Sequence, residues 1–242
     1  MAHTPEYRVL FAADIQSSAG RGNHAQLTIR RALFSATRDA MKAADIQLDD
    51  CHYEDTGDGL RIALPGGVPK AVMIHPFALE LALRLRQHNE LAAPIARIAL
   101  RCALHAGDVF VTDGRLEGTS LEFLARLLEA GLSRAALDEA VDTAPVVLAV
   151  SQHVYDEAVG HGYPGIDPHA FLSSSFQVKE TTAMAWFTLP GIGAPFQAAE
   201  KKVRPRASAG VPDSQGQTVV KPRGDIYKSP IHSGVGDQNV TY

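Results

Sequence analysis

The chain has 242 residues, with 23 lysines and arginines, 27 aspartates and glutamates, and a formal net charge of −4. Residues 1–190 carry 16 basic and 23 acidic side chains, a balance of −7, whereas residues 191–242 carry seven and four, a balance of +3. An acidic first part argues against a nucleic-acid-binding protein, which would show a basic stripe. No apolar run reaches the roughly 20 residues that span a bilayer. The N-terminus lacks the apolar region of a signal peptide, and two cysteines cannot form a disulfide framework, so we expect a cytoplasmic protein.

The first 190 residues alternate between strand-like and helix-like segments. In chain order, the pattern predicts strands at 7–15, 48–56, 60–64, 98–109, 146–150, 175–179 and 183–189. It also predicts a helix that begins at residue 23 and helices at 76–91, 121–130, 132–140 and 152–159. Asp-Gly in the turn after residue 56 is a strong hairpin signal between two strand-like runs. The segments predict one α+β domain over 1–190, an α/β sandwich with a ferredoxin-like sheet.

The pattern stops after Pro190. Residues 191–242 contain five prolines and seven glycines in 52 positions, with polar and basic residues between them. This composition cannot bury enough apolar area to offset the entropy of ordering. We therefore expect 191–242 to be a disordered basic tail.

Two carboxylates are candidates for a metal site: Asp14 at the end of the first predicted strand and Asp58 in the hairpin turn. If the hairpin lies beside the first strand, both side chains project from the same edge of the sheet. Carboxylates that converge beside exposed backbone amides can hold Mg²⁺, which keeps several waters and takes substrate phosphates into its shell. The alternative is that Asp58 is only a turn residue of a tight hairpin.

Four segments follow one another in a characteristic order: AADIQSS around Asp14, EDTGDGLRIAL around Asp58, then RIALRCALHAGDV and EGTSLEFLARLL. This order resembles the class III nucleotidyl cyclase homology domain, the domain of adenylate and guanylate cyclases, and the resemblance covers residues 7–189. It implies a βααββαβ-type sheet flanked by helices, and a homodimer with its active sites at the subunit interface. It also implies that Asp14, Asp58 and the backbone carbonyl of Ile15 bind two Mg²⁺ or Mn²⁺ ions per site.

The fourth segment is similar to the family's helix signature G-x-x-x-N-x-x-x-R, with Gly118, Glu122 and Arg126 at its three fixed positions. The resemblance implies that Arg126 stabilises charge on the α-phosphate while the 3′-hydroxyl attacks. Lys179, ahead of the last strand, lies where the family places a phosphate-binding lysine, although a solvated loop lysine is an equal alternative. The activity implied is conversion of a nucleoside triphosphate to a 3′,5′-cyclic nucleotide and pyrophosphate.

Three positions depart from the family pattern. Glu122 stands where the family has a ribose-orienting asparagine, and an anion there should weaken binding of a polyanionic substrate. At the base-contacting positions the chain has Leu116, which replaces a polar reader, and Glu54, which guanylate cyclases also carry. These substitutions leave the base open, pyrimidines included, and they leave catalysis and a silent cyclase-like module as alternatives.

The tail ends in IHSGVGDQNVTY, and residues 235–239 resemble the core of RHIM-like amyloid signalling motifs, a hydrophobic residue followed by Gly-x-x-Asn. The side chains of Gln238 and Asn239 suit stacked amide ladders. A motif within 224–242 would connect the domain to a downstream effector, and an unstructured C-terminus without function is the alternative. The sequence thus supports two functions: a nucleotidyl cyclase, or a catalytically inactive cyclase-like adaptor that senses a nucleotide or a partner and acts through its tail.

Overall fold

The computed structural model describes residues 4–112, 115–140 and 143–192. The elements are β1 (Glu6–Ile15), α1 (Asn23–Ala43), β2 (His52–Asp55), β3 (Gly59–Ala63), α2 (Lys70–Val72), α3 (Leu79–Leu91), β4 (Leu100–Thr112), β5 (Arg115–Glu117), α4 (Thr119–Leu128), α5 (Gly131–Ala140), β6 (Val146–Ser151), α6 (Gln152–Val154), β7 (Leu172–Val178) and β8 (Thr181–Thr188). The predicted tail and its C-terminal motif lie outside these residues, apart from Gly191 and Ile192.

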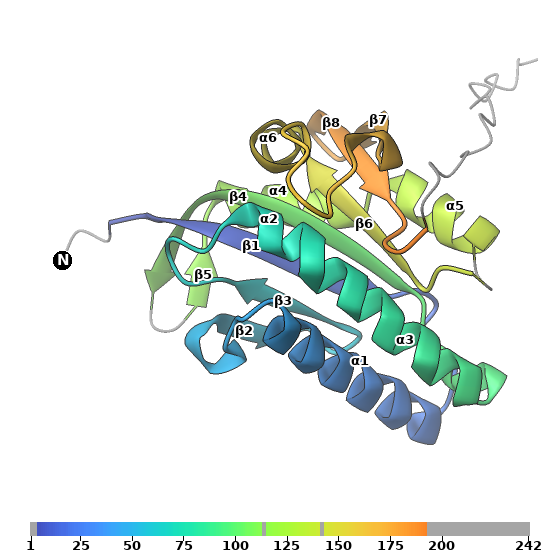
Figure 1. Cartoon of the computed structure of the whole chain (residues 1–242). Coiled ribbons are helices and arrows are strands. Elements are labelled where there is room, and N and C mark those ends of the chain that lie inside the picture. Colours follow the sequence, from blue (N-terminus) through green and yellow to red (C-terminus); the bar gives the residue numbers. More distant parts are fainter. Residues whose placement is uncertain (1–3, 113–114, 141–142, 193–242) are drawn as a thin grey trace, which may run out of the picture. The chain divides into compact units, whose positions relative to one another are not determined.

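The described strands form one sheet in the order β2-β3-β1-β4-β6-β8-β7, with β5 paired to β4 alone. Only β4 and β6 run parallel; the other neighbours are antiparallel. The helices α1 and α3 lie side by side across one face of this sheet (Figure 1). The other face is covered by α4, which contacts β1 and β4. The predicted α+β sandwich is therefore confirmed.

The strand β1 is buried on both faces, which explains its nearly continuous apolar sequence. Val9, Phe11 and Ile15 face the core under α1 and α3, whereas Leu10 and Ala12 face the core under α4. Because side chains alternate along a strand, Asp14 projects to the same face as Ala12. The sheet thus presents Asp14 on the α4 side, at the end where β1 stops.

The structure differs from the predicted elements mainly at two places. The segment before α3 is not one helix opening at Pro76: a π-helical turn over Met73–Ala78 contains that proline and follows the short α2. The strand β5, which no sequence pattern indicated, folds back on the end of β4 with Val111 opposite Leu116. In the described residues, no helix has both the length and the hydropathy to cross a bilayer.

Candidate functional site

Asp14 is the next-to-last residue of β1, and the sheet gives it one neighbour on each side. Its partner on β3 is Gly59, and its partner on β4 is Arg101. A side chain at Gly59 would collide with the carbonyl oxygen of Ala13, so the close approach of the two strands requires glycine there. On the other side, the Arg101 guanidinium makes an ion pair with Oδ2 of Asp14.

Asp58 lies in the turn between β2 and β3, which two hydrogen bonds anchor to the end of β1. The Ile15 amide donates to the carbonyl oxygen of Asp58 over 3.0 Å. The Ser18 hydroxyl donates to the carboxylate Oδ2 of Asp58 over 3.2 Å. Asp14 and Asp58 line one cavity of about 250 Å³, together with Leu128 at the end of α4 and Glu129 directly after it. The structure therefore brings together the two carboxylates that the sequence placed at one edge of the sheet.

The Asp14 side chain is only 18% exposed, and this burial is the main cause that raises the pKa of its carboxyl group. The negative charge of Asp58 raises this pKa further, while the Arg101 guanidinium opposes both effects. Oδ1 of Asp14 is buried and has no hydrogen-bond partner among the described residues. A buried carboxylate oxygen without a donor is costly, so this atom is poised to accept a cation or a donor from a ligand.

The donor set at this edge suits a hard divalent cation. Two carboxylates and the Ile15 carbonyl offer oxygen atoms of the kind that such ions prefer, and Oδ1 of Asp14 has no other partner. No group of three or more His, Cys, Asp or Glu side chains with metal-binding geometry occurs in the described part of the chain. Water and substrate phosphates would therefore have to complete the coordination shell of the ion. Such a shell is typical of Mg²⁺ and not of an ion with a structural role.

Arg126 belongs to a second group of charged residues, on a different part of the sheet. Its Nη2 donates to the carboxylate of Glu180 over 2.9 Å, and this bond is the main cause that lowers the pKa of the Glu180 carboxyl group. Glu180 and Lys179 form the exposed turn between β7 and β8, with Lys179 in the left-handed region at φ 52°. Arg126 and Lys179 are separated by 53 positions in the sequence, and the bond to Glu180 thus brings Arg126 to the turn that contains Lys179.

The two groups lie at opposite ends of the sheet. β4 is antiparallel to β1 and parallel to β6, and β6 is antiparallel to β8, so β8 runs in the same direction as β1. Asp14 lies where β1 ends, whereas the β7–β8 turn lies where β8 begins. Ala125 of α4 lines the Asp14 cavity, but Arg126 does not. One chain therefore does not place its arginine group on its own carboxylates.

The three residues that depart from the family pattern have different environments. Glu54 is half-buried on β2, where its carboxylate accepts a hydrogen bond from Arg61 over 3.1 Å. Leu116 is 6% exposed and lies in the core under α4, while its neighbours on β5, Arg115 and Glu117, face solvent. Glu122 is exposed in the first turn of α4. Of the positions near β5, Arg115 and Glu117 can touch a ligand and the Leu116 side chain cannot.

Sequence reasoning missed Arg101, although its sequence context held a signal. The stretch IALRCALHA is a buried strand with one arginine, and a charged residue in such a strand requires a partner. The partner, Asp14, could not be identified because the register of β4 against β1 is a tertiary property. Arg61 was missed for the same reason; it lines the cavity of Asp14 and pairs with Glu54.

No protein-family model matches the sequence, and no curated protein matches it either. The fold is similar to a solved adenylate/guanylate cyclase/hydrolase from Silicibacter pomeroyi, with a TM-score of 0.55 and 21% identity over 77% of this chain and 98% of that chain. It is also similar to the guanylyl cyclase Cya2, with a TM-score of 0.54 and 13% identity over 77% of this chain and 92% of that one. A bacterial light-regulated adenylyl cyclase gives a TM-score of 0.56 and 15% identity over 82% of this chain and 57% of that one. At these identities the similarity concerns the fold, which is that of class III adenylate and guanylate cyclase domains.

Proposed function

We propose that this chain is a divergent class III nucleotidyl cyclase, which converts a nucleoside triphosphate to a 3′,5′-cyclic nucleotide and pyrophosphate. The observation that carries the proposal is the convergence of Asp14 and Asp58, from separate segments of the chain, on one cavity. The fold that holds them is shared with solved adenylate and guanylate cyclases. Oδ1 of Asp14 has no partner while Oδ2 pairs with Arg101, which supports a role for Oδ1 in binding a cation.

In this proposal the carboxylates of Asp14 and Asp58 and the Ile15 carbonyl would hold two Mg²⁺ or Mn²⁺ ions. Ions at such a site lower the pKa of an attacking hydroxyl group and offset charge on a leaving pyrophosphate. The carboxylates must be ionised to bind cations. Because the pKa of Asp14 is raised, a cation that binds to the protonated carboxyl group would release its proton.

The arginines of the cavity would bind the triphosphate. Arg101 is held against Asp14, and its planar guanidinium can bind two phosphate oxygens at once. Arg61 lines the same cavity, where the Glu54 carboxylate holds its side chain in place. A substrate entering with cations would bring the negative charge that these two guanidinium groups attract, while Asp14 and Asp58 bind the cations.

The reaction would require two copies of the chain. Arg126 is bound to Glu180 at the β7–β8 turn and does not line the Asp14 cavity, which supports a site in which Arg126 and Lys179 come from a second subunit. A head-to-tail dimer with two-fold symmetry would place them there twice, giving two equivalent sites. The Arg126 guanidinium would then stabilise negative charge on the α-phosphate in the transition state, and Lys179 would bind the outer phosphates.

A second function, a catalytically inactive cyclase-like module that acts through its tail, is favoured by a specific observation. The Arg126 guanidinium is bound to Glu180, and Glu129 and Glu122 lie about one turn away on either side of it in the α4 segment. Three anions thus surround the residue that should meet a polyanion. Substitution Glu122→Asn separates the two functions. It should raise activity and nucleotide affinity in a cyclase, and it should leave an inactive module inactive.

The direct test is pyrophosphate release by the purified full chain with Mg²⁺ or Mn²⁺ and each of ATP, GTP, CTP and UTP. The proposal predicts release with at least one of them, a cyclic product, and loss of both in Asp14→Ala. The triphosphate that reacts also identifies the base. No release with any of the four, from a folded dimer, would contradict catalysis and support the module.

A further inference from the structure

A second cavity, of about 550 Å³, lies beside the loop that follows β1. It is bordered by the last turns of α3, by the segment leading into β4 and by the end of α5. It has more than twice the volume of the cavity of about 250 Å³ that holds Asp14, and the two share no lining residue. Its volume falls in the range of small-molecule sites.

Three arginines line this second cavity: Arg21, Arg86 and Arg97. Within residues 4–112, 115–140 and 143–192, no carboxylate oxygen lies within 4.0 Å of any of their guanidinium groups. In the same part of the chain, six other arginines are ion-paired: Arg8, Arg30, Arg61, Arg84, Arg101 and Arg126. Of the seven arginines in the described residues that have no ion pair, three therefore line this one cavity.

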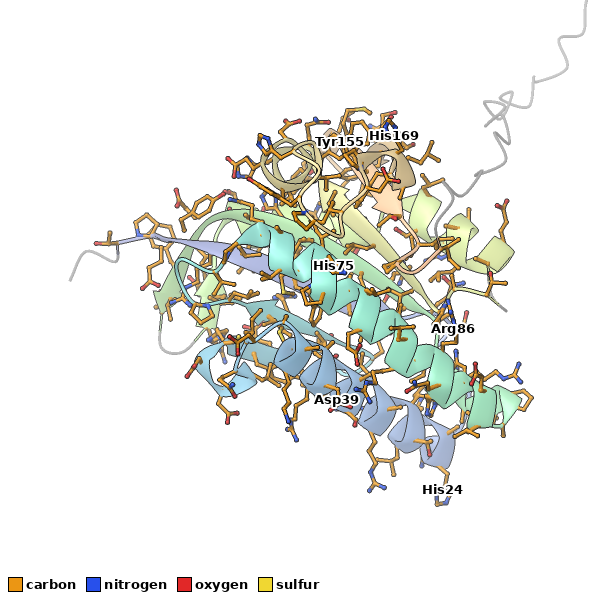
Figure 2. The ribbon with its side chains drawn as sticks, viewed as in Figure 1. His24, Asp39, His75, Arg86, Tyr155 and His169 are labelled. Atoms are coloured by element: carbon orange, nitrogen blue, oxygen red, sulfur yellow. The ribbon has the colours of Figure 1, made fainter. Side chains whose placement is uncertain are left out.

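The hydrogen-bonding capacity of these arginines is only partly used. Arg21 donates to the carbonyl oxygens of Ser17 and Arg97, and so joins the loop after β1 to the segment before β4. Arg86, labelled on α3 in Figure 2, donates through Nη2 to the Thr143 carbonyl over 3.0 Å. Its Nε is buried and without a partner, and the guanidinium of Arg97 makes no hydrogen bond within the described residues. Arg86 and Arg97 therefore offer donors to a ligand.

The cavity also holds acceptors. Glu90 and Asp138 line it, so three guanidinium groups against two carboxylates leave one positive charge. Asp138 accepts a hydrogen bond of 2.7 Å from the Gln16 amide, while the amide oxygen Oε1 of Gln16 is buried without a partner. A ligand that satisfies both unpartnered atoms, Arg86 Nε and Gln16 Oε1, must carry a hydrogen-bond acceptor and a hydrogen-bond donor, and the net positive charge of the cavity favours an anionic oxygen as the acceptor.

We propose that this cavity is a binding site for a small oxyanion that bears hydroxyl groups, a phosphorylated or carboxylated metabolite held by Arg86 and Arg97. Gln16 follows Asp14 and Ile15 directly, and its backbone N–H donates to the Ala99 carbonyl over 2.8 Å. A ligand bound to the Gln16 side chain therefore fixes the first residue of the loop beside the metal-site carboxylates. The proposal does not depend on catalysis, because binding and loop ordering occur without turnover.

The test is calorimetric titration of the full chain with ribose 5-phosphate and with citrate, in EDTA and without divalent ions. At least one of the two should bind saturably, and the one that binds identifies phosphoryl or carboxylate chemistry. Arg86→Gln and Arg97→Gln should each weaken that binding about tenfold or more, since each removes a charge-assisted hydrogen bond. The matched control is Arg84→Gln, two positions away on α3 and ion-paired to Glu80, which should bind like the wild type.

Hydrogen exchange gives an independent readout. The ligand should slow exchange of the amides of residues 16–22, and this protection should disappear in Arg86→Gln. Absence of saturable binding by both probes would overturn the proposal. So would binding that survives Arg86→Gln and Arg97→Gln but is lost in folded Arg101→Gln, because the anion would then occupy the cavity of Asp14.

Discussion

The two ends of the sheet hold carboxylate–arginine pairs in contrasting environments. At the end of β1, Asp14 is mostly buried, its pKa is raised, and one of its oxygens has no partner. At the β7–β8 turn, Glu180 is 70% exposed, its pKa is lowered, and it holds Arg126. In the proposed function, the first end would receive cations and the guanidinium of the second end would meet an anion.

In the proposed cyclase, each end would be half of a site. The Asp14 end would bind the cations and, through Arg61 and Arg101, the triphosphate, whereas the Arg126 end would supply the guanidinium for the transition state. In the structure the Arg126 guanidinium is bound to Glu180 at the turn where β8 begins, and it does not line the cavity of Asp14, which lies where β1 ends. A second copy with the two-fold arrangement of a symmetric dimer would bring the halves together.

The largest effect is expected at the Asp14 end. Asp58→Asn keeps an oxygen for the Ser18 hydroxyl but removes the charge that would hold a cation. We expect cyclic nucleotide formation to fall by about a thousandfold or more, with the folded fraction unchanged. The control is Asp49→Asn, an exposed residue of the turn before β2, which should keep full activity. Equal loss in both variants would show that the effect is not local.

The next largest effect belongs to the other end. Arg126→Gln should lower kcat by about a hundredfold with a smaller change in KM, because the guanidinium would act on charge that develops in the transition state. Initial rates over a range of substrate concentrations measure the two constants separately. Arg38→Gln, on the exposed side of α1, is the matched control. A change confined to KM would place Arg126 in ground-state binding instead.

The attachment of α4, which carries Arg126, should depend on pH. His105 donates to or accepts from the Ser151 hydroxyl at 2.9 Å, its ring lies 4.7 Å from that of Phe123 on α4, and burial lowers its pKa to about 4. In the unfolded chain His105 takes up a proton near pH 6.5, whereas in the folded protein it does so only near pH 4. The contribution of neutral His105 to the free energy of unfolding is therefore complete above pH 6.5 and is lost as the pH falls toward 4.

Urea unfolding at several pH values measures this loss. We expect His105 to contribute a decrease on the order of 2 kcal/mol in the free energy of unfolding between pH 6.5 and 4. In His105→Gln that part of the pH dependence should be absent, whatever its stability at pH 7. An identical slope in both proteins would mean that His105 is protonated as easily in the folded state.

The smallest effect concerns the ion pair that occupies Arg126. Glu180→Gln removes the carboxylate that holds the guanidinium at the surface turn. An exposed pair of this kind is worth about 0.2–1 kcal/mol, so kcat/KM should rise by at most about fivefold. Glu139→Gln, an exposed glutamate on α5, should change nothing. A decrease in kcat/KM for Glu180→Gln would mean that the pair positions Arg126 for its role.

Much of the fold followed from local patterns, because these record local physics. The unbroken apolar run of β1 and the Asp-Gly turn before β3 were readable, and together they place Asp14 and Asp58 at one edge. Arg126 could be located on a helix from the apolar spacing around it. These signals need only a few neighbouring residues to be recognised.

What the sequence did not reveal depends on contacts between distant segments. The ion pair of Arg101 with Asp14 follows from a strand register, and that of Arg126 with Glu180 joins residues 54 positions apart. The burial of Leu116 follows from β5, which is too short to show an alternating pattern. The second cavity gathers residues from four segments, and no single stretch of sequence indicates it.

The central claim, that the two ends are halves completed by a second copy, is tested most directly by mixing two inactive variants. Asp14→Ala and Arg126→Ala, combined in equal amounts under conditions that allow subunit exchange, should recover about a quarter of wild-type specific activity. Half of randomly formed dimers are mixed, and each mixed dimer has one complete site. Recovery at this level supports the claim. If each variant lacks activity, the subunits are shown to exchange, and the mixture remains inactive, the claim is wrong.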